Sequence, residues 1–215
     1  MPQIFHRSFN VISRVSIFGA IFFLVALGWV GAKTVRSPYY TNAFTAIEQP
    51  VPFSHRHHVG QLKIDCRYCH TAVEESPFAG MPTSKTCMNC HSQIWFRSPM
   101  LAPVRESYRP GGPALEWNRV HQLPGFVYFN HSIHIKKGIG CVSCHGRVDE
   151  MPLTWQVHTL YMDWCLDCHR EPEKHVRPRQ QVFNLAWEPP PDFDPEVYLK
   201  KYKVKSKTSC SVCHR

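Results

Sequence analysis

All ten cysteines of the chain fall in five copies of one motif, Cys-x-x-Cys-His, and none is left over. This spacing is that of c-type haem attachment, in which two thiols form thioether bonds to the porphyrin and the histidine becomes the proximal iron ligand. We therefore predict five haem c groups. The thiols that would carry them are Cys66 and Cys69, Cys87 and Cys90, Cys141 and Cys144, Cys165 and Cys168, and Cys210 and Cys213. The proximal ligands would be His70, His91, His145, His169 and His214.

Two other uses of cysteine fit this pattern less well. A disulfide framework gives no reason for a histidine after every pair. A zinc site can be built from two Cys-x-x-Cys pairs, but it does not need the histidine either. Histidine accounts for 14 of 215 residues, so five such neighbours by chance have a probability on the order of 10⁻⁶, which favours haem attachment.

A second element, Phe-x-His-x-x-His, precedes the first and the third motifs and indicates an internal repeat. It places His55 and His58 before the first motif, and His131 and His134 before the third. The first histidine lies eleven residues before its motif in one copy and ten in the other. We predict that all four are distal iron ligands, the first of each pair to a nearby haem and the second to a haem further away.

Four distal histidines leave one of the five irons without a distal ligand. Methionine is a known axial ligand, and the candidates are Met162, three residues before the fourth motif, and Met81, which the repeat relates to Met151. His158 is a rival for the same position. With these residues all five irons can have two axial ligands from the protein. No iron would then keep a free position for a substrate, and no catalytic residue is predicted. The chain is therefore expected to carry electrons and not to be an enzyme by itself.

The composition indicates an ordered but loop-rich protein. Apolar residues make up 43% of the chain and charged residues 19%, with 18 prolines, which excludes a highly charged disordered chain. Five haems in 215 residues would supply much of the apolar core. We predict a multihaem cytochrome c fold that is mostly irregular, with short α-helices packed around five haems, one N-terminal transmembrane helix and little or no β-sheet.

The order of the motifs divides the chain into five segments. These are a membrane anchor at 1–36, a first dihaem unit at 37–97, a connecting strap at 98–124, a second dihaem unit at 125–170, and a proline-rich extension at 171–215 that ends in the fifth motif. The strap is rich in proline and glycine, which favours a loop over a helix. The spacing of apolar residues predicts a helix over Leu153–Trp164. A further short helix is expected after Asp194 as its N-cap, with Pro195 in its first turn.

An uncharged stretch of 18 residues, Val15–Ala32, predicts a transmembrane helix over about residues 12–33. Arg7 and Arg14 precede it, so the positive-inside tendency places the N-terminus in the cytoplasm of a bacterium and the bulk of the chain on the periplasmic side of the inner membrane. The competing interpretation is a cleaved signal peptide, because the sequence from Val30 to Ala32 resembles a small-residue cleavage site. We expect an uncleaved single-pass anchor in contact with membrane lipid.

The formal net charge is +9, but five haems with two propionates each would bring the sum close to zero. We therefore expect no nucleic-acid partner. The lysine run over residues 200–207 has two interpretations, a solvated strand that faces propionates, which we favour, and a docking surface for an acidic partner. His57, His121 and His175 are assigned to hydrogen bonds with propionates or with the backbone.

The chain resembles a known family over most of its length. Its Phe-x-His-x-x-His element is similar to that of small trihaem and tetrahaem cytochromes c, one repeat at a time. The segments Trp117–His121, Phe126–Ser132 and Met162–Arg170, together with the anchor and the five motifs, resemble the pentahaem cytochrome c subunit of alternative complex III over residues 10–215. That resemblance implies a respiratory membrane complex that oxidises quinol and passes electrons to a periplasmic cytochrome or a terminal oxidase.

The same resemblance implies several partner subunits. These are an iron–sulfur subunit related to molybdopterin oxidoreductases, polytopic membrane subunits that bind quinol, and a monohaem cytochrome c. The alternative is a membrane-anchored multihaem quinol dehydrogenase that feeds a periplasmic reductase. A single apolar helix with no ionisable residue in its middle offers little for handling quinol protons, which favours the electron-transfer subunit.

Overall fold

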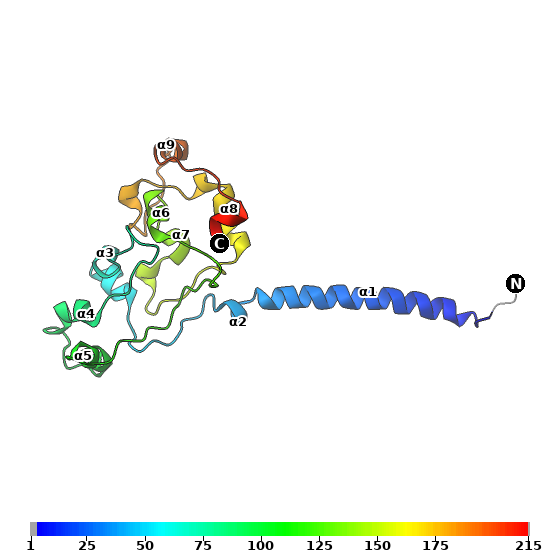
Figure 1. Cartoon of the computed structure of the whole chain (residues 1–215), viewed down its shortest axis with the longest axis horizontal. Helices are drawn as coiled ribbons and strands as arrows, with labels where there is room; N and C mark the ends of the chain where they lie inside the picture. Colours follow the sequence, from blue (N-terminus) through cyan, green and yellow to red (C-terminus); the bar gives the residue numbers. More distant parts are fainter. Residues whose placement is uncertain (1–3, 215) are drawn as a thin grey trace. The chain divides into compact units, whose positions relative to one another are not determined.

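The computed structural model describes residues 4–214 (Figure 1). The first three residues of the predicted anchor and the last residue of the predicted extension lie outside this range. The chain divides into two compact units, of which the first ends at Asn42 and the second begins at Ala43. All five Cys-x-x-Cys-His motifs belong to the second unit, so the predicted haem-binding region is separate from the apolar N-terminal segment.

The first unit consists of α1, Ser8–Val35, and the short α2, Pro38–Thr41. At 1.5 Å per residue, the 28 residues of α1 form a rod of about 42 Å, which is long enough to cross a bilayer. None of its side chains is buried within the chain. The helix extends beyond the predicted range 12–33 at both ends, because the flanking residues continue its hydrogen bonding. By length and composition it fits a membrane span and a signal sequence equally.

Short helices joined by irregular segments build the second unit. Its α-helices are α3 (Cys66–Cys69), α4 (Ser84–His91), α5 (Ala102–Tyr108), α6 (His131–Lys136), α7 (Val142–His145), α8 (Met162–Arg170), α9 (Pro195–Lys201) and α10 (Cys210–Cys213). A π-helix, Arg56–Gln61, and 3-10 turns at Pro99–Leu101, Val148–Glu150, Pro172–Lys174 and Arg179–Gln181 lie between them. In the described residues β-type pairing is limited to four isolated bridges. The prediction of a helical fold with little or no sheet is confirmed.

The two copies of Phe-x-His-x-x-His fold alike, except that one additional residue after the first copy changes its helix type. The second copy forms α6, whereas the first forms the π-helix. The carbonyl of His134 accepts from the amide five residues later, and that of the equivalent His58 from the amide six residues later, at 3.0 Å in both cases. A π-turn absorbs one extra residue. This explains why the first histidine lies eleven residues before its motif in one copy and ten in the other.

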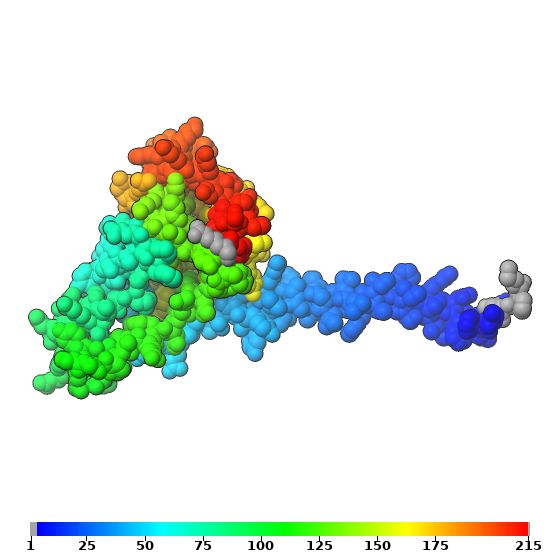
Figure 2. Space-filling model, viewed as in Figure 1, coloured from blue at the N-terminus to red at the C-terminus, as the bar shows by residue number. Residues whose placement is uncertain are grey.

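The polypeptide of the second unit has a small apolar core. Two clusters of buried residues form it, Val51, Met88, Leu101 and Val104 in one and Val73, Ile135 and Val182 in the other. Large apolar side chains remain exposed elsewhere in this unit, such as Phe78 at 72% and Phe126 at 63%. The C-terminal segment, orange to red in Figure 2, lies on the surface. Such a core is small for a chain of this size, as expected if cofactors supply the remaining apolar contacts.

The connecting strap differs from its prediction. The expected loop over residues 98–124 begins with a 3-10 turn that runs directly into α5. Pro99 and Pro103 occupy first-turn positions, where the missing N–H costs no hydrogen bond. Leu101 and Val104 are buried and attach this helix to the core. Only residues 109–124 are irregular.

The predicted helix over Leu153–Trp164 is wrong. Its first nine residues are not helical, and Trp155 and Gln156 instead form bridges with residues 43–46. Leu160 has a φ of +57°, which interrupts any helix at that position. The helix α8 begins only after these residues. Pairing with a segment far earlier in the chain therefore outweighs the helical spacing of the apolar residues.

Helix starts follow the capping rules. The Asp194 carboxylate accepts from the amide of Glu196 at 2.9 Å, and proline occupies the first turn of α9, as predicted. Asp65 accepts from the amide of Arg67 at 2.8 Å at the start of α3. Asn130 caps α6 through the amide of Ile133. Two of these caps fix helices that contain residues of the predicted haem sites.

Candidate functional site

Each Cys-x-x-Cys-His motif forms a turn of helix. In α3, α7 and α10 the helix consists of little else, whereas in α4 and α8 the motif completes a longer helix. Residues three apart share one face of a helix, so the two thiols of a motif point to the same side. The histidine amide closes the turn, as in His70 N to Cys66 O at 2.8 Å and His214 N to Cys210 O at 2.9 Å. None of the ten cysteines forms a disulfide.

The zinc alternative finds no support in the positions of the side chains. Within residues 4–214, no group of three or more His, Cys, Asp or Glu side chains is placed to share a metal ion. Burial raises the pKa of the Cys141 and Cys144 thiols to about 12. The arrangement suits covalent attachment of each pair to its own cofactor.

The proximal histidines share one pattern of hydrogen bonds. In four of the five, Nδ1 donates to a backbone carbonyl: His70 to Gly80 at 2.7 Å, His91 to Ile94 at 3.0 Å, His169 to Lys207 at 2.9 Å and His214 to Phe126 at 3.1 Å. A carbonyl oxygen only accepts, so the proton lies on Nδ1 and the lone pair on Nε2. This is the state in which an imidazole binds a metal while a second partner fixes its ring.

The four predicted distal histidines are held in the same way. Nδ1 donates from His58 to Ser54 O at 2.9 Å, from His131 to Pro77 O at 2.7 Å and from His134 to Asn130 O at 2.7 Å, and Nδ1 of His55 meets Thr154 Oγ1 at 2.8 Å. Two of these partners lie 54 and 99 residues away in the chain. The motif spacing therefore gives no sign of them, and the fold leaves Nε2 of each histidine available as a ligand.

Three pairs of histidines, each made of one predicted distal and one predicted proximal ligand, have the ring separation that binding to one iron requires. Two imidazoles on opposite faces of one iron have ring centres about 6 Å apart, because each metal–nitrogen bond is about 2 Å and each ring centre lies about 1 Å behind its nitrogen. The ring centroids are 6.1 Å apart for His58 and His91, 6.1 Å for His134 and His169, and 6.4 Å for His131 and His145. These distances match axial pairs at the second, fourth and third motifs.

His55 is the repeat equivalent of His131 and is therefore expected to pair with His70 at the first motif. Burial, followed by the nearby His70, lowers the pKa of His55 to about 4, so its ring is neutral at physiological pH. A neutral imidazole is the form that binds a metal. That the first histidine of each copy serves a nearby haem and the second a haem further away stays a prediction.

One phenylalanine holds both histidines of each copy. Phe53 stacks on His58 with centroids 4.3 Å apart and meets His55 edge-on at 4.9 Å. In the second copy Phe129 stacks at 4.4 Å and meets the other ring edge-on at 4.8 Å. Such aromatic pairs add to the hydrogen bonds in fixing the rings. The arrangement is the same in both copies, which indicates that the phenylalanine of the element helps to position the two histidines.

The fifth proximal histidine, His214, lacks a second imidazole at this separation among the described residues. Met162 is the first residue of α8, one turn before Cys165, and the Cys165 thiol lies within electrostatic reach of Cys213. Met162 is 64% exposed in the polypeptide. Met81 directly follows the glycine whose carbonyl binds the first proximal histidine, and so lies beside a different site. These positions favour Met162 over Met81 as the distal ligand of the fifth site.

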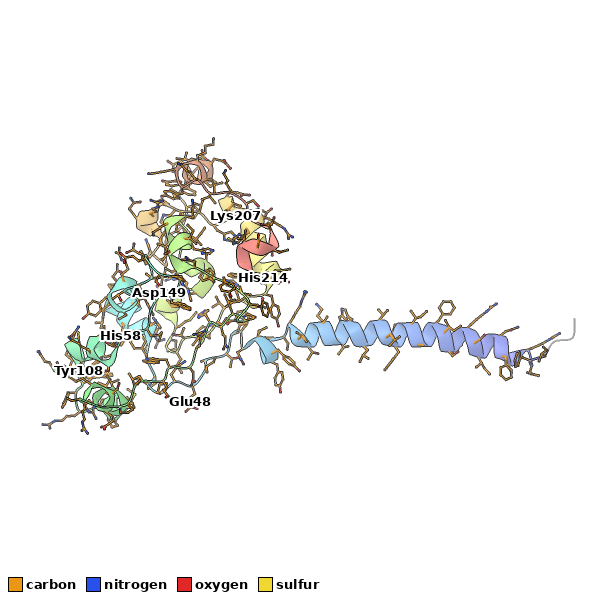
Figure 3. The ribbon with its side chains drawn as sticks, viewed as in Figure 1. Glu48, His58, Tyr108, Asp149, Lys207 and His214 are labelled. Carbon is orange, nitrogen blue, oxygen red and sulfur yellow. The ribbon has the colours of Figure 1, made fainter. Side chains whose placement is uncertain are left out.

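Electrostatic influence between thiols of different motifs indicates that the five motifs lie in a row. Those within electrostatic reach of one another are Cys69 and Cys87, Cys66 and Cys141, Cys144 and Cys168, and Cys165 and Cys213. The sites therefore follow one another in the order second, first, third, fourth, fifth. Figure 1 shows α4, α3, α7 and α8 in this order across the second unit, and Figure 3 shows His58 and His214 toward its opposite ends.

Among the described residues, three buried polar side-chain atoms have no hydrogen-bond partner in the polypeptide. They are Nε1 of Trp117, Nε2 of His121 and Nε of Arg177. Such atoms are rare in folded proteins and call for a partner. Propionate oxygens are acceptors for indole and guanidinium N–H groups, so these residues fit a protein that contains haem. The His121 ring also contacts the proximal His145, with centroids 4.3 Å apart.

Arg177 is held in a place that only glycine neighbours allow. Its guanidinium lies 4.9 Å from the ring centre of Trp187, and Nη1 donates to Asn184 O at 3.3 Å. A Cβ at Gly140, the residue before Cys141, would lie 2.4 Å from Cζ of Arg177. The sequence analysis assigns no role to this arginine. It is a buried cation directly beside the third haem motif.

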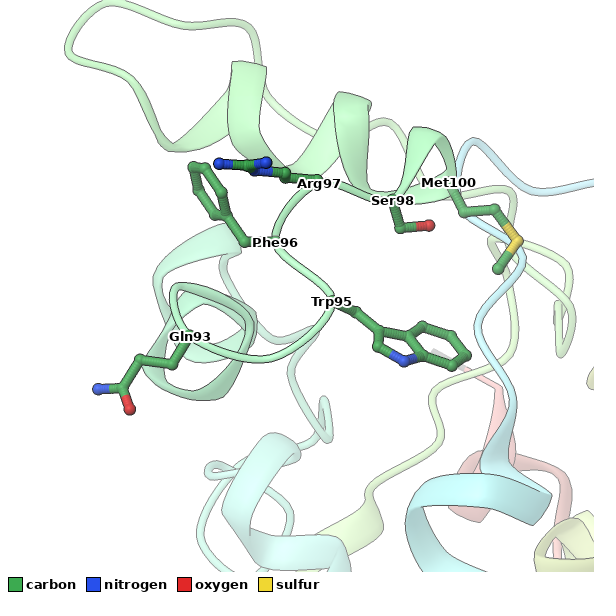
Figure 4. A pocket seen from close by; sticks show the side chains of 6 residues that line it. All are labelled: Gln93, Trp95, Phe96, Arg97, Ser98 and Met100. Atoms are coloured by element: carbon green, nitrogen blue, oxygen red, sulfur yellow. The ribbon is translucent and has the colours of Figure 1, made fainter.

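A surface pocket of about 550 Å³ adjoins the second motif. Its lining residues are Gln93, Trp95, Phe96, Arg97, Ser98 and Met100. Figure 4 shows the side chains of Trp95 and Met100 on the same side of this loop. The Trp95 ring is nearly parallel to that of His57, at 9° with centroids 6.3 Å apart. The end of the row at α4 is therefore aromatic and apolar.

The chain is similar to known cytochromes c in its C-terminal half. Residues 127–215 match the family model of cytochrome c7 and related cytochrome c. A stretch of 98 residues, 46% of the chain, is 35% identical to the multiheme cytochrome c subunit of the menaquinone reductase of Nitratidesulfovibrio vulgaris and covers 46% of that relative. The matching stretch thus spans about half the length of the relative.

The family match includes the second Phe-x-His-x-x-His element and the last three Cys-x-x-Cys-His motifs. Cytochromes c carry c-type haem, which agrees with the histidines prepared for metal binding and with the small core of the polypeptide. The helical second unit and the apolar N-terminal helix complete this picture. Residues 127–215 are thus similar to cytochrome c7 and related cytochrome c, and this segment contains three of the five motifs.

Proposed function

We propose that the chain is the electron-transfer subunit of a membrane complex of the alternative complex III type. It would bind five haem c groups and relay electrons from a quinol-oxidising part of the complex to a periplasmic cytochrome or a terminal oxidase. The observation that carries this proposal is the row of five sites, eight of whose nine candidate histidine ligands have Nδ1 hydrogen-bonded. Each bound haem would supply one-electron transfer.

The residues around each site support relay rather than bond chemistry. Thioether attachment by two cysteines and hydrogen bonds at Nδ1 hold each group in place. Two imidazoles at four of the sites, and an imidazole with a methionine at the fifth, would leave no iron with an open position for a substrate. Because the sites form one row, each would exchange electrons only with its neighbours. The second and fifth motifs then form the two ends, where external partners would be reached.

The same proposal extends to location and partners. The helix α1 would anchor the chain once in a bacterial inner membrane, with Arg7 and Arg14 on the cytoplasmic side and the second unit in the periplasm. The partners would be an iron–sulfur subunit related to molybdopterin oxidoreductases, polytopic quinol-binding subunits and a monohaem cytochrome c. No nucleic-acid partner is proposed, since propionates would offset the net charge of +9.

A second candidate function rests on the relative. The subunit from Nitratidesulfovibrio vulgaris belongs to a menaquinone reductase, a name that describes electron flow toward quinone. The present chain would then pass electrons from a periplasmic donor into the membrane complex. The row of sites serves either direction, so the measured potentials of the haems and the identity of the co-purified subunits would distinguish the two.

The number of haems is tested on the denatured chain. Thioether bonds survive denaturation and axial bonds do not, so the intact mass should exceed that of the polypeptide by five haems. The double variant Cys210→Ser, Cys213→Ser is the matched control and should carry four. A motif found as two unmodified thiols in the wild-type chain would remove that site from the proposal.

The function is tested by separating the chain from its complex. Extraction in mild detergent should yield an assembly that oxidises a quinol analogue, whereas the purified chain should be reduced by artificial donors and show no quinol oxidation. A purified chain that oxidised the analogue at a rate near that of the assembly, with the same inhibitor sensitivity, would support the quinol dehydrogenase alternative instead.

A further inference from the structure

The end of the row at the fifth motif carries a run of exposed lysines. They are Lys200, Lys201, Lys203, Lys205 and Lys207, and all five are exposed to solvent. No aspartate or glutamate follows Glu196 in the chain. Among the described residues, none of the five lysines takes part in an ion pair. We name these residues the lysine surface.

The backbone beneath the lysine surface is fixed. Lys137 donates through Nζ to the carbonyls of Tyr202 at 2.6 Å and Lys203 at 3.1 Å. The Tyr202 side chain is buried, with 5% exposed. The carbonyl of Lys207 accepts from Nδ1 of His169, the proximal histidine of the fourth motif. A fixed segment that presents lysines to solvent is a preorganised charged surface, and it loses less entropy on binding than a loose tail would.

The position of the lysine surface ties it to two haem sites. One of its carbonyls holds the imidazole of the fourth site, and Cys210 of the fifth motif follows three residues after its last lysine. Figure 3 shows Lys207 in the same part of the second unit as His214. The lysine surface therefore ends beside the terminal site of the row, which is one of two places where an external partner would exchange electrons.

Two acids near the lysine surface are already paired. Asp167 on the neighbouring α8 is paired with Arg170 at 4.0 Å, and Glu171 is paired with Lys174. Glu196, one turn before Lys200 on α9, and the propionates of haems at the fourth and fifth motifs would offset part of the positive charge. All five lysines are nevertheless exposed and form no ion pair among the described residues, so they remain available to an acidic partner.

We propose that the lysine surface docks a soluble electron carrier whose redox centre is surrounded by acidic side chains. The proposal rests on the proposed function, because it needs a haem at the fifth motif. Each encounter would move one electron, so that one iron is oxidised as the carrier is reduced, or the reverse, and no bond forms or breaks. Opposite charges accelerate the encounter by about 10- to 1000-fold at low salt.

The test measures electron exchange by stopped flow. The full-length chain, purified in mild detergent and reduced, is mixed with an acidic monohaem cytochrome c as probe and with a basic one as counter-probe. With the acidic probe the rate constant should fall steeply as salt is added, because the Debye length shortens to about 8 Å at physiological ionic strength. With the basic probe it should rise. A salt-independent rate with the acidic probe would overturn the proposal.

Charge reversal gives the second measurement. The triple variant Lys203→Glu, Lys205→Glu, Lys207→Glu should slow the acidic probe at low salt by about tenfold or more and invert its salt dependence. Equal rates in variant and wild type would overturn the proposal. The salt dependence of the wild-type chain decides the case even if the variant fails to fold.

A matched control applies the same charge change at the other end of the row. The variant Lys63→Glu, Lys85→Glu, Arg97→Glu alters residues around the first and second motifs and should keep the wild-type rate with the acidic probe. An equal loss in this control would show that total charge decides the rate, which overturns a local docking surface. Intact mass separates the two failures: a fifth motif without haem contradicts the proposed function, whereas a complete chain with unaffected rates contradicts only the docking surface.

Discussion

Replacement of His131 by alanine tests the ligand pairing most sharply. The planes of the His131 and His145 rings differ by only 13°. The other two measured pairs are twisted, by 62° at the second motif and 67° at the fourth. Ferric low-spin haem with nearly parallel axial imidazoles gives a rhombic EPR spectrum, whereas strongly twisted imidazoles give a spectrum dominated by one large g value. The third site should therefore have a signal that distinguishes it from the second and fourth.

The size of the expected change follows from the number of sites. His131→Ala would open one axial position among five, so about a fifth of the ferric iron should change from low spin to high spin. The rhombic signal of the parallel pair should disappear, and both large-g signals should remain. The variant also loses the hydrogen bond from Nδ1 to Pro77 O, which costs about 1 kcal/mol and leaves the fold in place.

The assay compares EPR and absorption spectra of the ferric chain before and after substitution. Added imidazole should bind the open position and restore the low-spin spectrum. His57→Ala is the matched control, because His57 bonds Gln61 and belongs to no axial pair, and its spectrum should equal that of the wild type. An unchanged spectrum of His131→Ala would remove this residue from the ligands. If His131→Ala instead lost a large-g signal and kept the rhombic one, His131 and His145 would be ligands of different irons.

Three further predictions concern single side chains. Met162→Ala should abolish the sulfur-to-iron charge-transfer band, whereas Met81→Ala should keep it; the reverse result would exchange their roles. Arg177→Met should lower the reduction potential of one haem in a redox titration, because a buried cation disfavours the ferric state. The control Arg179→Met, which removes an exposed arginine, should change no haem potential. Equal potentials in both variants would contradict the role of the buried charge. The paired arginine lowers the pKa of Asp149 through two hydrogen bonds of 2.8 Å, so Asp149→Asn should cost about 0.5–1 kcal/mol in denaturant unfolding at pH 7. That difference should vanish as pH falls through the lowered pKa, where the wild-type carboxyl is protonated too, and a difference that persisted at low pH would point to packing instead of charge.

Helix prediction succeeded where the signal is local and failed where distant residues compete. The cap at Asp194 with proline in the first turn is a local arrangement, and α9 begins there as predicted. The apolar spacing of Leu153–Trp164 is equally helical, yet Trp155 and Gln156 pair with residues 43–46, and that pairing keeps the segment extended. In the strap, prolines were expected to prevent a helix but instead stand in the first turn of one. The five segment bounds along the chain remain a prediction.

The sequence by itself determined the grouping of two thiols and a histidine on which the prediction of covalent attachment rests, because residues at Cys-x-x-Cys-His spacing share one helical turn whatever surrounds them. It also determined which histidines repeat before the motifs. The tertiary structure alone decided which of them face one another, since Pro77 lies 54 residues from His131, whose ring it orients. It also decided the order of the sites and the place of Arg177, since a buried cation beside Cys141 depends on glycines and an aromatic ring that come together only in the folded chain.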